Sequence, residues 1–164
     1  APCSNESIAT YWGSRSTQQV SGVQSLSSTY ADVTGSSITY RPPVGANTVI
    51  YRFSFQFSQS DADPLVHFKF YVGSDEIIYA RHTKRADDHQ DRTTFEWPIR
   101  IDGSQGTNLN HGRLQSWNGD KVLKMQAREY SDSYEAKLHV TNNWDATGTD
   151  MFSMPVITII ALGS

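Results

Sequence analysis

The stretch from Asn47 to Ser58 most constrains the fold of this 164-residue chain. Successive side chains of a β-strand point to opposite faces, whereas a helix distributes alternating residues around its axis. In this stretch every second residue is large and apolar: Val49, Tyr51, Phe53, Phe55 and Phe57. The residues between them are Ile50, Arg52, Ser54 and Gln56. The pattern predicts a strand with one face against a core and the other toward water or a polar partner surface.

Similar alternation recurs along the chain in short segments bounded by Gly, Pro, Asn and Asp. The further strands are expected at 65–73, 76–84, 92–101, 121–130, 134–141 and 151–162. Within 76–84, Ile78 and Ala80 are expected to point inward, and within 134–141, His139 falls on the polar face. Short strands spaced by about 8–12 residues, without helical periodicity, indicate an all-β fold. We expect an antiparallel β-sandwich, specifically a jelly roll.

The length fits one domain with a core of its own. Residues 1–16 show little apolar alternation and are interpreted as an N-terminal arm, which leaves 17–164 as a single jelly-roll domain. The final segment, Met151 to Leu162, is almost continuously apolar, which implies burial on both faces. The simplest cover for its second face is another subunit, and the alternative is the N-terminal arm folding over it.

Composition narrows the functions available to the chain. The net charge of −3 provides no strong field to attract nucleic acid or an anionic membrane, so neither is expected as a partner. No apolar run is long enough to cross a bilayer. Cys3 is the single cysteine, which excludes an intrachain disulfide. Stability must therefore come from packing, in which aromatic residues (12%) have a large share, or from oligomerisation.

No catalytic signature stands out, and we predict that the chain is not an enzyme. No serine lies in a Gly-x-Ser-x-Gly elbow. Sugar hydrolysis requires two facing carboxylates. The glutamates of the expected strands could supply them but are more simply surface charges: Glu76, Glu96, Glu129 and Glu135. Residue types that bind metals occur together in the loop that contains His82, Asp87, Asp88, His89 and Asp91, but their spacing matches no defined signature. We expect a solvated loop there, and no metal or cofactor.

Carbohydrate recognition is the more credible small-ligand activity. Two loop sequences place a tryptophan beside amide and carboxylate side chains, which together suit a sugar ring: Trp117-Asn118-Gly119-Asp120 and Asn142-Asn143-Trp144-Asp145. The candidate ligand-binding residues are Trp117, Asn118, Asn143, Trp144 and Asp145. Alternatively, each tryptophan anchors its loop on the sandwich.

The order of features resembles the trimeric jelly rolls of the TNF-like and complement-head group. A Pro/Gly turn, Pro42-Pro43-Val44-Gly45, precedes the aromatic strand, and Gly119-Asp120-Lys121-Val122 begins a later one. The loop Trp144-Asp145-x-x-Gly148 and the ending that starts at Pro155 depart from the animal proteins. They look more like small jelly-roll structural proteins of aquatic viruses, including phages, which build fibres, spikes and capsid decorations.

This resemblance implies a homotrimer located in the virion, with other capsid or fibre proteins and a host-surface glycan as further partners. Bulky outward residues of central strands and the doubly apolar last strand suit a subunit interface. The expected interface residues are Arg52, Ser54, Lys69, Tyr71, Ile157 and Ile159. We therefore expect a non-enzymatic virion protein, such as a capsid decoration, spike or fibre head. The alternative is a secreted, lectin-like carbohydrate-binding module outside the cell.

Overall fold

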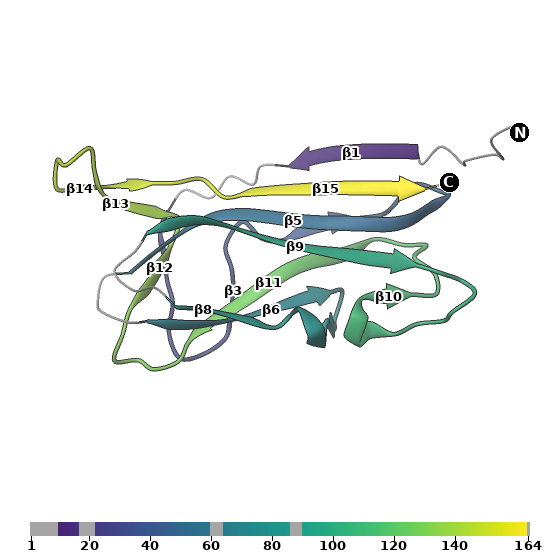
Figure 1. The fold of residues 1–164 in the computed structure, drawn as a ribbon, viewed down its shortest axis with the longest axis horizontal. Helices are drawn as coiled ribbons and strands as arrows, with labels where there is room; N and C mark the ends of the chain where they lie inside the picture. Colours follow the sequence, from purple (N-terminus) through teal and green to yellow (C-terminus); the bar gives the residue numbers. More distant parts are fainter. Residues whose placement is uncertain (1–9, 17–21, 60–63, 86–89, 164) are drawn as a thin grey trace, which may run out of the picture.

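The computed structural model describes residues 10–16, 22–59, 64–85 and 90–163. Within these ranges the chain is all-β, with two short 3₁₀ turns and no α-helix. Two sheets face each other as a sandwich, and a separate two-stranded hairpin extends from one end of it (Figure 1). The expectation of an all-β sandwich is confirmed.

The larger sheet is built around the long strand predicted at Asn47–Ser58. Its main strands lie side by side in the order β1 (Thr10–Ser16), β15 (Val156–Gly163), β5 (Ala46–Gln59) and β9 (Asp91–Ile101), each antiparallel to its neighbour. Shorter strands extend it: β12 (Ala136–Leu138) on the far end of β5, β2 (Gln24–Ser25) on β12, and β10 (Arg113–Leu114) parallel to β9.

The smaller sheet is centred on β11 (Lys121–Glu129) and β6 (Leu65–Val72), which pair antiparallel. The free edge of β11 carries β3 (Ala31–Asp32) and β4 (Ile38–Tyr40). The free edge of β6 carries β7 (Asp75–Glu76) and β8 (His82–Arg85). The hairpin consists of β13 (Val140–Trp144) and β14 (Thr149–Phe152).

The core fills the space between the inner faces of the two sheets. All five apolar residues predicted for one face of β5 are at most 1% exposed. The predicted inward residues of β6 are buried opposite them: Val66, Phe68, Phe70 and Val72. The rings of Tyr51 and Phe70 lie 4.8 Å apart across the sandwich. The Tyr51 hydroxyl donates a hydrogen bond to the carbonyl of Ser36 (2.6 Å), so this buried polar group has a partner.

The prediction of one continuous strand over 76–84 is wrong. The segment divides into β7, a 3₁₀ turn η1 (Ile78–Ala80) and β8. Ile77, which is fully buried, takes the inward position that was expected of Ile78, whereas Ala80 is buried as predicted. The 3₁₀ turn breaks the two-residue period of a strand, which is why alternation places the wrong isoleucine inside.

The N-terminal strand β1 lies within the segment interpreted as an arm. It pairs with β15 along its whole length, from Thr10–Gly163 to Ser16–Ile157, and so extends the sheet at its edge (Figure 1). The backbone of these arm residues therefore lies beside β15 in the sheet and does not fold over its outer face. Cys3 lies outside the described residues.

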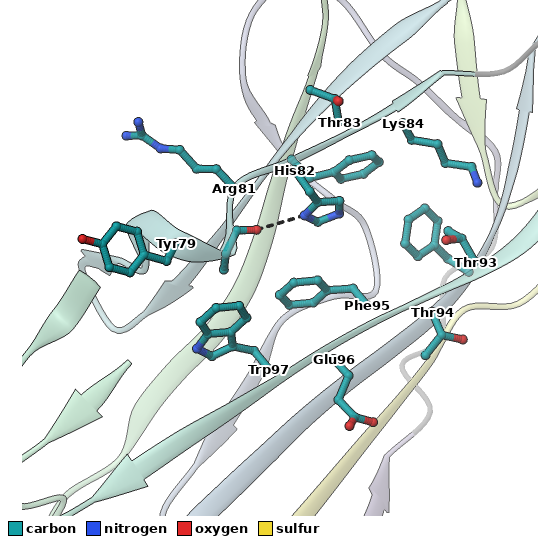
Figure 2. A pocket seen from close by; sticks show the side chains of 13 residues that line it. Tyr79, Arg81, His82, Thr83, Lys84, Thr93, Thr94, Phe95, Glu96 and Trp97 are labelled. Atoms are coloured by element: carbon teal, nitrogen blue, oxygen red, sulfur yellow. Dashed lines mark hydrogen bonds between the residues drawn. The ribbon is translucent and has the colours of Figure 1, made fainter. Parts of the chain in front are cut away.

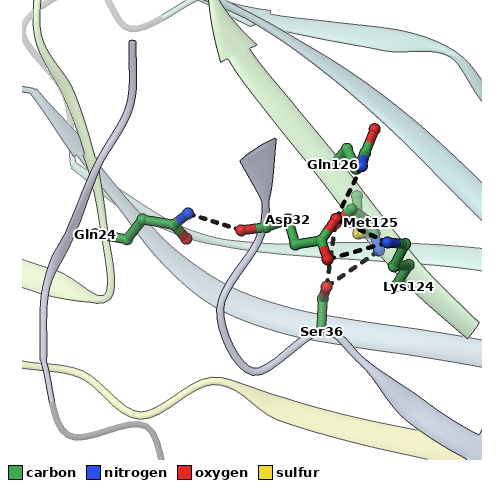
Figure 3. A network of polar contacts seen from close by, with 6 residues as sticks. All are labelled: Gln24, Asp32, Ser36, Lys124, Met125 and Gln126. Atoms are coloured by element: carbon green, nitrogen blue, oxygen red, sulfur yellow. Dashed lines mark hydrogen bonds and ion pairs between the residues drawn. The ribbon is translucent and has the colours of Figure 1, made fainter. Parts of the chain in front are cut away.

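Asp32 connects the segment between β2 and β4 to β11 through hydrogen bonds (Figure 3). Its carboxylate accepts hydrogen bonds from Lys124 (3.0 Å) and from Gln126 (2.8 Å), two outward residues of β11. Ser36, which is fully buried, bonds through its hydroxyl to both the N–H and the carbonyl of Met125. The contacts of Asp32 with Lys124 and Gln126 make the outer face of the smaller sheet polar near β3.

Candidate functional site

A cleft opens on the side of the sandwich where β8 and β9 face each other from opposite sheets. We call it the β8–β9 cleft; its volume is about 440 Å³. Neither the outer edge of β8 nor the 91–98 edge of β9 carries a further strand within the described residues. Aromatic side chains dominate its walls: Phe55, Phe68, Tyr79, His82, Phe95 and Trp97 (Figure 2). The volume lies within the range of small-molecule sites, roughly 300–1,000 Å³.

The imidazole of His82 joins the two walls of the cleft. It stacks nearly parallel on Phe68 of its own sheet (centroids 5.0 Å apart) and on Phe95 of the other sheet (5.2 Å). Its Nδ1 lies 2.9 Å from the carbonyl of Ala80, and a carbonyl can only accept. Nδ1 therefore carries the hydrogen in this arrangement, and Nε2 of the neutral ring is an acceptor.

Interactions across the sandwich close both ends of the cleft. At one end, Lys84 of β8 forms an ion pair with Asp91 of β9 (2.8 Å). At the other end, the ring of Tyr79 meets that of His111 edge-on (4.7 Å). The indole N–H of Trp97 donates to the His111 carbonyl (3.1 Å). His111 belongs to the 3₁₀ turn η2 (Leu109–His111) in the long segment 102–120, so this segment contacts two residues that line the cleft, Tyr79 and Trp97.

Gly112 leaves room for the side chain of Trp97, because it has no Cβ. Its φ of +77° lies in the left-handed region that favours glycine. A Cβ at this position would stand 2.7 Å from Trp97 Nε1, well inside van der Waals contact. The sequence therefore needs glycine here for two reasons, the backbone conformation and the close approach of the indole.

The outer face of the larger sheet is a second candidate surface. The outward residues of β15 include Val156, Ile160 and Leu162, which are half-buried. Ile160 pairs directly with Ile50 of β5, which in turn pairs with Pro98 of β9, so an apolar band crosses three strands. We refer to this band as the outer apolar face.

Charged residues flank the outer apolar face. Arg52 pairs with Glu96 at 2.6 Å, and both side chains are about two-fifths exposed. Arg92 donates to the hydroxyl of Ser54 (2.9 Å) and to the carbonyl of Met154 (2.9 Å). Arg52 and Ser54, two of the expected interface residues, thus lie beside this apolar band.

The other expected interface residues lie elsewhere. Ile157 and Ile159 are fully buried in the core, because the alternation of β15 points odd-numbered residues inward; their assignment to an interface is corrected. Lys69 and Tyr71 face outward from the smaller sheet, on the opposite side of the sandwich from Arg52. Lys69 Nζ also lies 4.2 Å from the ring centroid of Tyr30. One flat interface cannot contain both pairs.

The two predicted glycan-binding loops are far apart. Trp117 and Asn118 line a separate cavity of about 350 Å³ together with Ala46, the first residue of β5. Trp144 lies in the hairpin, whose chain leaves the sheet where the N–H of His139 bonds to the carbonyl of Gln56. The intervening stretch of β5 spans roughly 30 Å at about 3.3 Å per residue. The two loops therefore do not form one site.

In each of these loops, candidate side chains already make contacts within the protein. Trp117 is 5% exposed, meets Tyr40 edge-on and donates its indole N–H to Gly119, as the anchor alternative predicts. In the hairpin, the Asn143 side chain accepts from the N–H of Gly148 (2.8 Å), and Asp145 has a φ of +53° in the turn. Trp144 is exposed at 58%.

His139 departs most from its expected position. It is fully buried at the junction of β12 and β13, with a φ of +67° and its ring edge-on to Phe55. Burial, with the nearby positive charge of Arg92, lowers the pKa of His139 to about 4, although the backbone of Thr34 opposes this shift. The left-handed residue interrupts the alternation, which is why a position on the polar face of the pattern lies inside.

No group of three or more potential ligand residues comes together in the part of the chain that the structure describes. Asp87, Asp88 and His89 of the candidate metal loop lie outside the described residues. Among the candidate glutamates, Glu76 pairs with Arg81, and Glu129 is fully buried and accepts from the N–H of Ala136. No described helix has the length and apolarity needed to cross a membrane.

The fold and these surfaces define an all-β sandwich protein with an aromatic cleft at its open side. No family model matches the chain, and no curated protein matches it. Among solved structures, it is similar to a protein of the Gx strain of infectious bursal disease virus, with 10% identity and a TM-score of 0.38. That similarity covers 99% of this chain and 43% of the viral one.

Two further solved structures are similar to this chain. The VP2 subviral particle of infectious bursal disease virus has 9% identity and a TM-score of 0.40, over 98% of this chain and 42% of that one. A family two carbohydrate esterase from Cellvibrio japonicus has 8% identity and a TM-score of 0.29, over 96% and 35%. The chain spans less than half the length of each of these proteins.

Proposed function

We propose that the chain is a non-enzymatic structural protein of a virion, which assembles as a homotrimer of jelly-roll subunits. The observation that carries this proposal is the outer apolar face of the larger sheet. In a monomeric sandwich, the outward-facing residues of a sheet are expected to be polar. Here Ile50, Val156, Ile160 and Leu162 point outward from adjacent strands.

The order of the strands supports the jelly-roll assignment. The main strands of the larger sheet follow the order β1-β15-β5-β9, and those of the smaller sheet follow β4-β11-β6-β8. The first and last of these strands are thus neighbours, and successive strands alternate between the two sheets, except that β6 and β8 lie in the same sheet. Eight strands connected in this way correspond to two Greek keys, the arrangement of a jelly roll.

A second copy of the chain is the partner that best fits the outer apolar face. The apolar band has an Arg52–Glu96 ion pair beside it, so the surface presents both charge signs and can meet its own copy without uncompensated charge. An apolar centre with an arginine-containing rim is typical of subunit interfaces. The number of copies, three, follows the resemblance of the sequence to trimeric jelly rolls.

The virion location follows the same resemblance, and jelly rolls are common among viral capsid and lectin domains. A role as a capsid decoration, spike or fibre head gives the chain other capsid or fibre proteins as partners. The absence of enzymatic activity is part of the proposal. Carboxylates that could serve as acids or bases, such as Glu76 and Glu96, are held by arginines in ion pairs.

Placing a charge in the outer apolar face is expected to dissociate the trimer. In Ile160→Asp, assembly would bury an unpaired carboxylate, which costs several kcal/mol. Size-exclusion chromatography with light scattering is expected to give a trimer for the unmodified chain and a folded monomer for the variant. The control is Val122→Asp, at an apolar residue that is 39% exposed on the smaller sheet, which should stay trimeric. Retention of the trimer by Ile160→Asp would contradict the assigned interface.

A further inference from the structure

We propose that the β8–β9 cleft binds a neutral saccharide. The site differs from the outer apolar face, because it opens at the side of the sandwich between the sheets; the two surfaces meet at Glu96, which lines the cleft and pairs with Arg52. It also differs from both tryptophan loops that the sequence suggested. Four features support this assignment: its aromatic walls, its polar groups, its balanced charges and its closed ends.

The aromatic walls suit the apolar face of a sugar ring. Tyr79 is 59% exposed, and Trp97 is partly exposed with its N–H already bonded to His111. Both therefore offer ring surface to a ligand at small cost in desolvated polar atoms. Rigid aromatic side chains with a polar tip supply such contact with little loss of conformational freedom.

The polar groups suit hydroxyls. In the neutral imidazole of His82, Nε2 is an acceptor at the stacked centre of the cleft when Nδ1 donates to Ala80. The hydroxyl of Thr93, which lines the cleft from β9, can both donate and accept. A sugar hydroxyl can likewise donate to the imidazole and accept from the threonine.

The charges at the cleft are balanced, which favours a neutral ligand. Arg81 forms a two-point hydrogen bond to Glu76 (2.6 and 3.1 Å). Lys84 pairs with Asp91, and Glu96 pairs with Arg52. An acidic or basic ligand would have to compete with these internal partners.

The closed ends favour compact rings over an extended peptide. A strand that added to the edge of β9 would have to break the Lys84–Asp91 pair, which joins the two sheets at one end. β8 is only four residues long, and Pro98 removes a backbone donor from β9. Addition of a peptide strand requires a continuous edge of backbone donors and acceptors.

The test is binding of the full chain to an array of oligosaccharides built from neutral hexoses and N-acetylhexosamines, with sialylated and sulfated ones for comparison. We expect binding to neutral members, and calorimetry with the strongest of them should show affinity weakened about tenfold or more in Tyr79→Ala. His82→Phe retains the stacking ring but removes the acceptor, and it should weaken binding similarly. Circular dichroism and native mass checked on each variant separate lost binding from lost fold or assembly.

The controls are exposed aromatic residues away from the cleft. Tyr130→Ala, at a tyrosine 64% exposed, and Trp144→Ala, in the hairpin, should both bind as the unmodified chain does. The proposal is overturned if no neutral saccharide binds, or if binding persists unchanged in folded Tyr79→Ala and His82→Phe. Loss of binding in Trp144→Ala alone would assign the sugar to the hairpin, and selective capture of extended peptides would assign a different ligand class.

Discussion

Replacing Phe70 with alanine is expected to lower the free energy of unfolding by about 3–5 kcal/mol, the usual cost of removing a buried phenylalanine. Phe70 is fully buried on β6, and its ring contacts Tyr51 on β5 (4.8 Å) and Phe95 on β9 (5.2 Å). It therefore joins the smaller sheet to two strands of the larger one. Equilibrium unfolding in urea, followed by circular dichroism, measures the loss.

The matched control for Phe70 is Tyr130→Ala, because Tyr130 is aromatic but 64% exposed. Its substitution should change the free energy of unfolding by less than about 0.5 kcal/mol. A loss below about 1 kcal/mol for Phe70→Ala would show that the two sheets do not pack through this ring.

Acidification from pH 6.5 to pH 4 is expected to remove about 3 kcal/mol of stability through His139. Its pKa is lowered from 6.5 to about 4 in the folded protein by burial, assisted by repulsion from Arg92 and opposed by the backbone of Thr34. The unfolded chain takes up the proton first, so the stabilisation is complete above pH 6.5 and declines as the pH falls toward 4. Below pH 4 both states are protonated, and this loss ends.

The control is His139→Asn, which removes the titrating ring and tolerates the left-handed φ of +67°. Its unfolding free energy should be nearly flat between pH 6.5 and about 5, where the unmodified chain already loses stability. Hydrogen bonds from Arg81 lower the pKa of Glu76, and hydrogen bonds from Ser28 lower that of Asp132, so these carboxyls lose stability in both proteins as the pH falls below their ordinary pKa values of 4.5 and 3.8. Parallel pH curves for the variant and the unmodified chain would contradict the assignment to His139.

The sandwich was predictable from the sequence wherever side chains alternate without interruption. β5 and β6 are the clearest cases, because burying Phe53 or Phe70 on one face forces every second neighbour to the other. The prediction failed at Ile77 and His139, where a 3₁₀ turn and a left-handed residue shift the alternation by one position. Nothing in a two-residue period signals such shifts in advance.

The candidate cleft was less predictable than the fold. Its main walls come from β8 and β9, which follow one another in the chain but lie at facing edges of different sheets, and Phe55 and Phe68 add to the lining from β5 and β6. Alternation within a strand does not indicate which strand edges face each other. The one local signal was Gly112 in the long segment 102–120, where a glycine before a strand admits the close approach of Trp97. The sequence pointed to the two tryptophan loops as glycan-binding sites, because their polar residues are adjacent to the tryptophans in sequence. In the structure, however, Trp117 is a buried anchor.

The structure makes the prediction for the outer face of β5 more specific. The sequence predicted that it meets a neighbouring subunit, and its residue Ile50 lies in an apolar band with Ile160 and Pro98. Arg52 and Ser54 flank this band, whereas Lys69 and Tyr71 face the other way. An interface through the larger sheet is therefore the specific form that the assembly proposal takes.

The native mass of the unmodified chain at micromolar concentration tests this proposal most directly. Three copies of the 18.4 kDa chain give a particle of about 55 kDa, which we expect as the main species by native mass spectrometry. A main species of 18.4 kDa under the same conditions would contradict assembly through the outer apolar face.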